Sequence, residues 1–302
     1  MEATTSSISA RAARRREMDR THIAKYFAFE APPPSQGDLV VELPADIASR
    51  AALYRELVQG LRFPGHLNFD WCTLSDCLND FAWLTERRVV LKHKALPKLS
   101  ELELWTYLDI LAEAVVSWGL EEAHELVVVF PESARATLEN VAMLSLFVDE
   151  SEGEDVFEEV LVRRHAAERF EFLSSPDLLL GVAAGDVIEL LPKGRFRVVT
   201  HGGNVCVQSY LGAQAQDLEP DLHARLHAIG GRVDGRSPGV LVGTIPLVPT
   251  GFAAIERVME SFVKDHPPAT WAYGNVHEDE DGNVPLAWWP PLVKERRVRR
   301  TK

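Results

Sequence analysis

Four carboxylates on a stretch that contains no lysine or arginine mark one part of this 302-residue chain as a candidate site. No lysine or arginine occurs between Arg62 and Arg87, whereas the stretch carries Asp70, Asp76, Asp80 and Glu86. Asp76 and Asp80 are four residues apart, so on a helix they would repel each other by about 0.2–0.5 kcal/mol. A basic groove on a partner would be attracted to the two carboxylates and would offset the repulsion between them. The pattern therefore predicts charge complementarity with another molecule.

A helix is expected over residues 71–83, because the apolar side chains recur at helical spacing. Its buried face would hold Trp71, Leu74, Cys77, Leu78 and Phe81. The opposite face would present Cys72, Asp76, Asn79, Asp80 and Trp83. Asp70 stands at the position of a helix N-cap, and the loop 63–68, which contains His66, leads into the helix. An enzyme groove that binds RNA phosphates would be a suitable basic counterpart for the exposed face.

The same stretch resembles the barstar family of ribonuclease inhibitors. The matching residues are Pro64, Trp71, Leu74, Asp76, Cys77, Leu78, Asp80 and Trp83, and the resemblance extends over about residues 38–131. It implies that the helix and the loop before it occlude the active site of a microbial ribonuclease, with an acidic side chain in place of a substrate phosphate. Asp76 is the strongest candidate for that role, and Glu113 on a later helix matches a second acidic contact.

The chain departs from the family pattern at several positions. Cys72 occupies a position that is acidic in many members, and Asp70 moves a carboxylate to the start of the helix. His66 stands at the aromatic position of the loop, and Asn68 replaces its glycine. Two functions therefore stay open. One is a ribonuclease inhibitor, such as the immunity protein of a toxin–antitoxin pair, and the other is a protein-binding adaptor that keeps the fold as a scaffold.

Strands and helices alternate around this stretch. Short apolar strands are expected at residues 39–43, 88–92 and 125–130. Helices are expected between them, one following Asp46 as its cap and ending at Gly60, and another over residues 102–118. Helices between apolar runs predict a small parallel three-stranded sheet, and hence an α/β domain over residues 38–137.

The flanking segments are predicted to be less structured. Residues 1–37 are expected to be a flexible arm, in which residues 26–29 could add an edge strand, and residues 291–302 a basic tail. Residues 138–157 are rich in carboxylates and predict an acidic linker, with one short helix at residues 141–147. The two halves of the chain are therefore expected to fold separately.

The back half, residues 158–290, is predicted to be an α+β domain. It begins with hairpin strands and a helical turn near residues 176–184. A β-α-β-β-α-β order follows from residue 205 to residue 276, with its first helix at residues 221–229, which is the order of a ferredoxin-like unit. The region resembles an uncharacterised bacterial domain family over about residues 158–280, with Gly185-Asp186 in its motif, and the resemblance implies no function.

Composition and motifs narrow the function further. The net charge of −13 argues against nucleic acid as the main partner, and no apolar run is long enough for a membrane span. The three cysteines, none placed to form a disulfide or a zinc site, together with the absence of an apolar leader, favour the cytoplasm. No nucleophile–base pair, metal site or cofactor motif is recognisable, so we expect no enzyme activity and no cofactor.

Several histidine motifs favour ordinary structural interpretations over sites. His201 is expected in a glycine turn between strands, because the chain has no nucleophile elbow. His277 precedes an acidic turn that lacks calcium-ligand spacing, and His223 and His227 are expected on a helix surface. The pair Trp288-Trp289 is expected to pack against the back domain.

Overall fold

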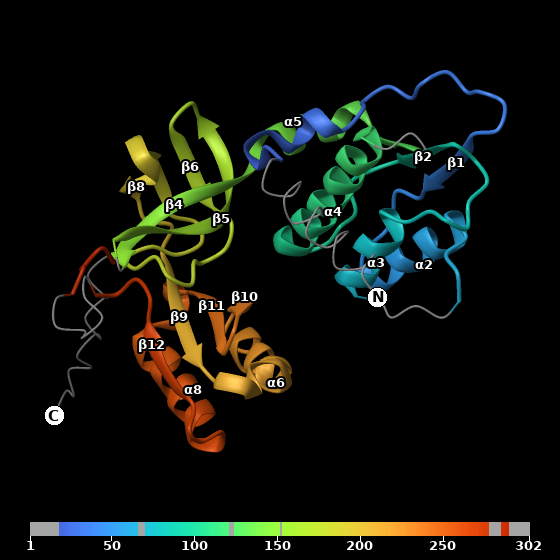
Figure 1. Cartoon of the computed structure of the whole chain (residues 1–302). Coiled ribbons are helices and arrows are strands. Elements are labelled where there is room, and N and C mark those ends of the chain that lie inside the picture. Colours follow the sequence, from blue (N-terminus) through green and yellow to red (C-terminus); the bar gives the residue numbers. More distant parts are fainter. Residues whose placement is uncertain (1–17, 66–69, 121–123, 152, 278–284, 290–302) are drawn as a thin grey trace, which may run out of the picture. The chain divides into compact units, whose positions relative to one another are not determined.

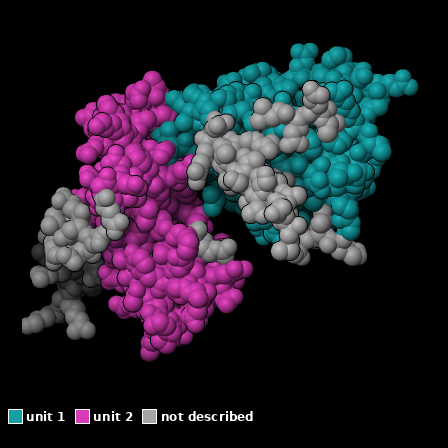
Figure 2. Space-filling model, viewed as in Figure 1, with its two compact units in different colours: residues 1–144, 161–164 teal, residues 145–160, 165–302 magenta. Residues whose placement is uncertain are grey.

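The computed structural model describes residues 18–65, 70–120, 124–151, 153–277 and 285–289. The chain divides into two compact units, shown in two colours in Figure 2. The first unit comprises residues 1–144 with 161–164, and the second comprises residues 145–160 with 165–302. Four predicted features lie outside the described residues: His66, Asn68, the acidic turn after His277 and the basic tail.

The first unit is built on a parallel three-stranded sheet (Figure 1). Its strands lie in the order β1 (Leu39–Leu43), β2 (Arg88–His93) and β3 (Glu125–Val129). Parallel neighbours need crossover connections, and the helices between the strands are α2 (Arg50–Gly60), α3 (Trp71–Leu78) and α4 (Glu101–Leu120). The predicted α/β fold is confirmed.

The start of α2 differs from the prediction. Its N-cap is Ser49, whose hydroxyl accepts a hydrogen bond of 3.2 Å from the Ala52 amide, and not Asp46. Ser49 has the extended backbone that a cap requires, and its hydroxyl is three residues from the amide that it satisfies. Leu53, Tyr54 and Leu57 form the buried face of the helix.

Part of the predicted N-terminal arm belongs to the first unit. The 3-10 helix η1 (Arg20–Tyr26) buries Ile23, and Phe27 packs edge-on against Phe130. Arg20 binds both carboxylate oxygens of the buried Asp109, at 2.9 and 2.5 Å. The prediction of a flexible arm is therefore wrong for these residues. Ala28 forms a bridge with Val129, which confirms an edge contact for residues 26–29.

The acidic stretch is a pair of long strands and not a linker. The 3-10 turn η2 (Glu132–Ala134) and helix α5 (Arg135–Asn140) precede β4 (Val141–Ser151) and β5 (Glu154–Ala166). The helix predicted at residues 141–147 is wrong, because Ala142, Leu144 and Leu146 alternate with more exposed neighbours, which is the period of a strand. The carboxylates lie mainly on exposed positions of these strands.

A five-stranded sheet follows, in the order β4-β5-β6-β7-β8. Its remaining strands are β6 (Arg169–Phe172), β7 (Val187–Leu190) and β8 (Phe196–Thr200), with the short η3 (Pro192–Gly194) before β8. Gly194 has φ +71°, and a Cβ there would lie 2.9 Å from the Ser145 carbonyl oxygen. Glycine adopts this conformation without strain, and its lack of a Cβ permits the close approach to the β4 backbone.

The last part of the chain is the predicted ferredoxin-like unit. Its sheet has the order β10-β11-β9-β12, and every neighbouring pair is antiparallel. The elements are β9 (Asn204–Tyr210), η4 (Gly212–Gln214), α6 (Ala215–His227), β10 (Arg232–Ser237), β11 (Val240–Pro246), α7 (Leu247–Thr250), α8 (Phe252–Asp265) and β12 (Thr270–Tyr273). The first helix starts six residues before its predicted start at residue 221, because α6 accommodates Pro220 within it.

Helices α6 and α8 supply buried residues to the core on one face of this sheet. Leu222, Leu226, Ile255, Met259 and Phe262 pack with Val205, Val207 and Leu241 of the strands. Trp288 and Trp289 pack against the same core, as predicted. His223 and His227 are exposed on the surface of α6, also as predicted.

Candidate functional site

Asp70 is the N-cap of α3. Its Oδ1 accepts a hydrogen bond of 2.7 Å from the Thr73 amide, and its backbone has the extended conformation of a cap. The same amide favours the ionised carboxylate and lowers the pKa of Asp70 below its ordinary value. Asp70 therefore holds the start of the helix, and a contact between it and a partner stays a prediction.

Helix α3 separates apolar from exposed residues as the sequence predicts. Leu74, Cys77 and Leu78 are buried, whereas Cys72 and Asp76 are exposed. Trp71 is only half-buried, and its ring lies 6.0 Å from that of Tyr54. Exposed Cys72 and Asp76 are thus presented by a helix whose other face is part of the core.

The helix is shorter than predicted, because it ends at Leu78 and not near Trp83. Asn79 is the C-cap, and its side-chain amide donates a hydrogen bond of 2.8 Å to the Ser75 carbonyl. Phe81 then takes a left-handed φ of +43°, which no continuing helix allows. Asp80 is exposed in the turn that follows the helix, so the repulsion expected between helical neighbours does not apply in that form.

Buried contacts with helix α4 hold this turn in place. Phe81 is fully buried and stacks on Trp118 of α4, at a centroid separation of 5.6 Å and an interplanar angle of 5°. The indole N–H of Trp118 donates a hydrogen bond of 2.8 Å to the Leu78 carbonyl, which is one of the acceptors left open at the end of α3. The position of Asp80 is therefore set by packing.

Trp83 is not part of the exposed face. Its indole N–H donates a hydrogen bond of 3.0 Å to the Leu61 carbonyl, and its ring packs edge-on against Phe63 and Phe81. The helix ends before Trp83, so the angular position expected for this residue does not apply, and a contact between Trp83 and a partner stays a prediction. Asn79 is half-buried and serves as the cap.

Glu113, the second acidic candidate, lies on α4 and is half-buried. Helix α4 packs on α3, so Glu113 and Asp76 lie on two helices that are in contact (Figure 1). The structure therefore brings Cys72, Asp76 and Asp80 together at α3, and places Glu113 on the helix that supports them.

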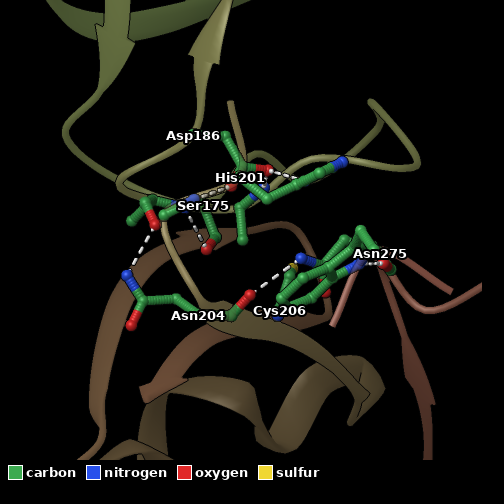
Figure 3. A network of polar contacts seen from close by, with 10 residues as sticks. Ser175, Asp186, His201, Asn204, Cys206 and Asn275 are labelled. Carbon is green, nitrogen blue, oxygen red and sulfur yellow. Dashed lines mark hydrogen bonds and ion pairs between the residues drawn. The ribbon is translucent and has the colours of Figure 1, made fainter. Parts of the chain in front are cut away.

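A second polar cluster lies in the second unit, where sequence reasoning predicted only turns. Residues 173–186 connect β6 to β7 without helical structure, so the helical turn predicted there is wrong. The Ser175 amide donates a hydrogen bond of 2.7 Å to the buried carboxylate of Asp234, and the Ser175 and Thr244 hydroxyls lie 2.5 Å apart. Figure 3 shows this cluster where the loop meets the ferredoxin-like sheet.

Asp186 is the acidic centre of the cluster and is fully buried. Its carboxylate accepts hydrogen bonds from the amides of Gly202, at 2.7 Å, and Ala183, at 2.9 Å. The Nδ1 atom of His201 lies 3.2 Å from the same carboxylate, and the His201 ring stacks on Trp288. Burial raises the pKa of Asp186, against the opposing effect of these hydrogen bonds.

The hydrogen bonds of the cluster hold the loop on the sheet and do not form a catalytic arrangement. The Ser175 hydroxyl is engaged with Thr244 and with the Ala184 amide, while His201 contacts Asp186, so serine and histidine do not form a nucleophile–base pair. Cys206 is fully buried, and burial raises the pKa of its thiol. The polar groups of the loop and of the sheet thus satisfy one another's hydrogen-bonding capacity. The sequence signal was the Gly185-Asp186 motif, interpreted only as a turn.

Two classes of site find no support in the part of the chain that the structure describes. It contains no group of three or more histidine, cysteine, aspartate or glutamate side chains that could hold a metal ion. None of its helices combines the length and the apolar composition needed to cross a membrane.

Fold and site together define a protein with an α/β domain that presents an acidic helix, followed by an α+β part with a ferredoxin-like unit. Residues 40–131 match the family of barstar, the barnase inhibitor. Residues 158–266 match a domain of unknown function (DUF4265). The chain thus carries a barstar-like domain in front of a domain of an uncharacterised family, and both predicted resemblances are confirmed.

The other comparisons add little. A search of the curated proteins finds no match. A hypothetical protein from Neisseria gonorrhoeae, known as a crystal structure, is similar at 12% identity with a TM-score of 0.36, over 44% of this chain and 94% of the other.

Proposed function

We propose that the barstar-like domain inhibits a ribonuclease by placing the exposed side of α3 in the basic groove of the enzyme, as an immunity protein would. The observation that carries the proposal is the presentation of Asp76 and Asp80, both exposed, by a helix and turn fixed from below by Leu78 and Phe81. The family match of residues 40–131 supports it.

The proposed mechanism is occlusion. The two carboxylates occupy positions in the groove that substrate phosphates would take, and the negative net charge of the chain attracts a basic enzyme. Because α3 is held by buried contacts, little conformational freedom is lost on binding. Inhibition of this kind makes and breaks no bond, so we expect no turnover by the chain itself.

The test uses barnase, the ribonuclease named in the description of the family. Wild type should inhibit RNA cleavage by barnase, and Asp76→Ala should weaken binding strongly. Truncating one partner of a buried charge contact costs about 2–5 kcal/mol, or roughly 30-fold or more in the dissociation constant. Surface plasmon resonance should show the loss mainly as faster dissociation, and Asp80→Ala should act in the same direction.

Asp46→Ala is the matched control, because Asp46 is an exposed aspartate of the first unit outside α3. It should change the association rate slightly and leave the dissociation rate unaltered. Cys72→Asp restores the acidic residue of many family members and should tighten the complex. If wild type inhibits barnase and neither Asp76→Ala nor Asp80→Ala weakens binding, α3 is not the inhibitory surface. If wild type does not inhibit barnase, the chain is better described as an adaptor.

A further inference from the structure

The ribbon formed by β4 and β5 has one outward face that no other described strand uses for its core. On β4 this face carries Ser145, Phe147 and Asp149, and on β5 it carries Asp155, Phe157 and Glu159; we refer to these six residues as the ribbon face. The residues between them turn inward, as the burial of Leu144, Leu146 and Val160 shows. The ribbon face therefore combines aromatic rings with carboxylates.

The two aromatic rings form its centre. Phe147 and Phe157 lie edge to face, with centroids 5.9 Å apart, and Phe157 remains 43% exposed. The guanidinium group of Arg195 lies 4.7 Å from the centroid of the Phe147 ring, a cation–π contact within the chain itself. The same chemistry is suitable for the more exposed ring of Phe157.

The backbone of β4 is not the feature that a partner would recognise here. Gly194 lies so close that a Cβ on it would be 2.9 Å from the Ser145 carbonyl oxygen, 3.1 Å from the Cε1 atom of Phe157 and 3.2 Å from the Phe147 amide nitrogen, so this glycine covers part of one edge of the Phe157 ring. An added β-strand cannot occupy space that is already filled. Recognition at this point must therefore use side chains.

The charge around the rings selects the kind of partner. Three carboxylates of the ribbon face border the rings at exposed positions, namely Asp149, Asp155 and Glu159, whereas Glu150 and Glu154 alternate to the other face of the ribbon. An arginine or lysine side chain can place its cation on the Phe157 ring and its charge beside Asp155 and Glu159. Nucleic acid and anionic membrane surfaces are negatively charged like the ribbon face and would be repelled by it.

We propose that the ribbon face binds an arginine-rich segment of a partner protein, with arginine stacked on Phe157. Five of the six ribbon-face residues, from Ser145 to Phe157, lie between the two matched segments, 40–131 and 158–266, and Glu159 falls at the start of the second. The proposal therefore goes beyond the inhibition assigned to α3 and does not depend on it.

The test measures binding of a fluorescein-labelled peptide of alternating arginine and serine to the full chain, by fluorescence anisotropy. A lysine–serine peptide and a glutamine–serine peptide of equal length are the comparison probes. We expect the arginine peptide to bind best and the glutamine peptide not at all. Phe157→Leu should weaken arginine-peptide binding about two- to fivefold, the factor that an exposed cation–π contact contributes. Asp155→Asn combined with Glu159→Gln should weaken it further and reduce its salt dependence.

The matched control is Asp46→Asn combined with Glu30→Gln, which removes two exposed carboxylates of the first unit and should leave peptide binding unchanged. Phe157→Tyr, which keeps the ring, should bind as wild type does and guards against a loss caused by misfolding. Equal binding by wild type and Phe157→Leu would overturn the proposal. So would equal binding of the arginine and lysine peptides, or a loss confined to the control variant.

Discussion

Glu158 of β5 fixes the loop that covers the ferredoxin-like sheet, and replacing it by alanine tests that role. Its carboxylate accepts three backbone hydrogen bonds, from Asp177 at 2.6 Å, Leu178 at 3.0 Å and Leu179 at 2.9 Å. Glu158 follows an exposed acidic stretch, but its own side chain is half-buried, unlike that of the exposed Phe157. Glu158→Ala removes all three acceptor contacts at once.

The expected loss of stability follows from opposing contributions. A hydrogen bond to a charged group contributes about 1.5–3 kcal/mol, so three bonds set an upper limit near 9 kcal/mol. Burial raises the pKa of Glu158, although the three backbone hydrogen bonds lower it. The cost of dehydrating the ionised carboxylate therefore opposes the stabilisation that these hydrogen bonds provide. We therefore expect Glu158→Ala to reduce the free energy of unfolding by about 2–4 kcal/mol.

Urea unfolding measures the free energy, and hydrogen exchange of the three amides localises the effect. Protection of Asp177, Leu178 and Leu179 should fall in the variant, while the amides of β9 keep theirs. Glu154→Ala, which removes an exposed carboxylate of the same strand, should stay within about 0.5 kcal/mol of wild type. An unchanged midpoint for Glu158→Ala, with the loop amides still protected, would refute the assignment of Glu158 as the fastening of this loop.

Three further perturbations have definite expected outcomes. Thr244→Val keeps the shape but removes the hydroxyl that bonds Asp234, so it should lower the free energy of unfolding in urea by about 1–3 kcal/mol, and Thr244→Ser should restore most of it. Gly194→Ala should cost about 1–2 kcal/mol or more in the same assay, because φ is +71° and the β4 backbone is in the way. The Thr73 amide lowers the pKa of Asp70, so the carboxylate stabilises the fold above its ordinary pKa of about 4 and loses this effect as the pH falls through the lower, folded value. The difference in thermal midpoint between wild type and Asp70→Ala should therefore be largest near neutral pH and shrink towards pH 2; a constant difference would contradict the assignment.

The order of strands and helices in the first unit could be predicted because the signal is local. Val89, Val90 and Leu91 are buried in succession, which is typical of a central parallel strand covered on both faces. The same holds for the ferredoxin-like unit, where amphipathic helices alternate with short strands. In both cases periodicity within ten residues identifies the element.

The ends of elements were predicted less well. The helix expected to reach Trp83 ends at Leu78, because Asn79 caps it and Phe81 adopts a left-handed conformation. Asn79-Asp80 is a recognisable turn signal, but Phe81 and Trp83 beyond it continue the helical spacing of apolar residues and so favour a longer helix. For residues 141–147 the alternation of Ala142, Leu144 and Leu146 indicated a strand, but the density of carboxylates was given more weight.

The polar cluster of the second unit could not be predicted from local sequence. Ser175 bonds Asp234, which is 59 residues away, and the Cys206 amide bonds the Asn275 side chain, 69 residues away. Such partners meet only when the loop folds onto the sheet, so neither residue carries a local sign of its role. A buried polar residue needs a partner, but the sequence alone does not identify which one.

The departures of α3 from the barstar pattern can alter the target without altering the fold. The residues that hold the helix, Leu74 and Leu78, are buried, whereas Cys72 and Asp76 are exposed. Substitution on the exposed side therefore changes the charge that a partner meets and leaves the core contacts intact. Because affinity for a basic groove depends on each placed carboxylate, a cysteine in place of an acidic residue removes one attractive contact and shifts preference towards a groove with fewer cations. In the inhibition that we propose, the fold thus sets where the contact surface lies, and the side chains at positions 72, 76 and 80 set which basic protein it fits.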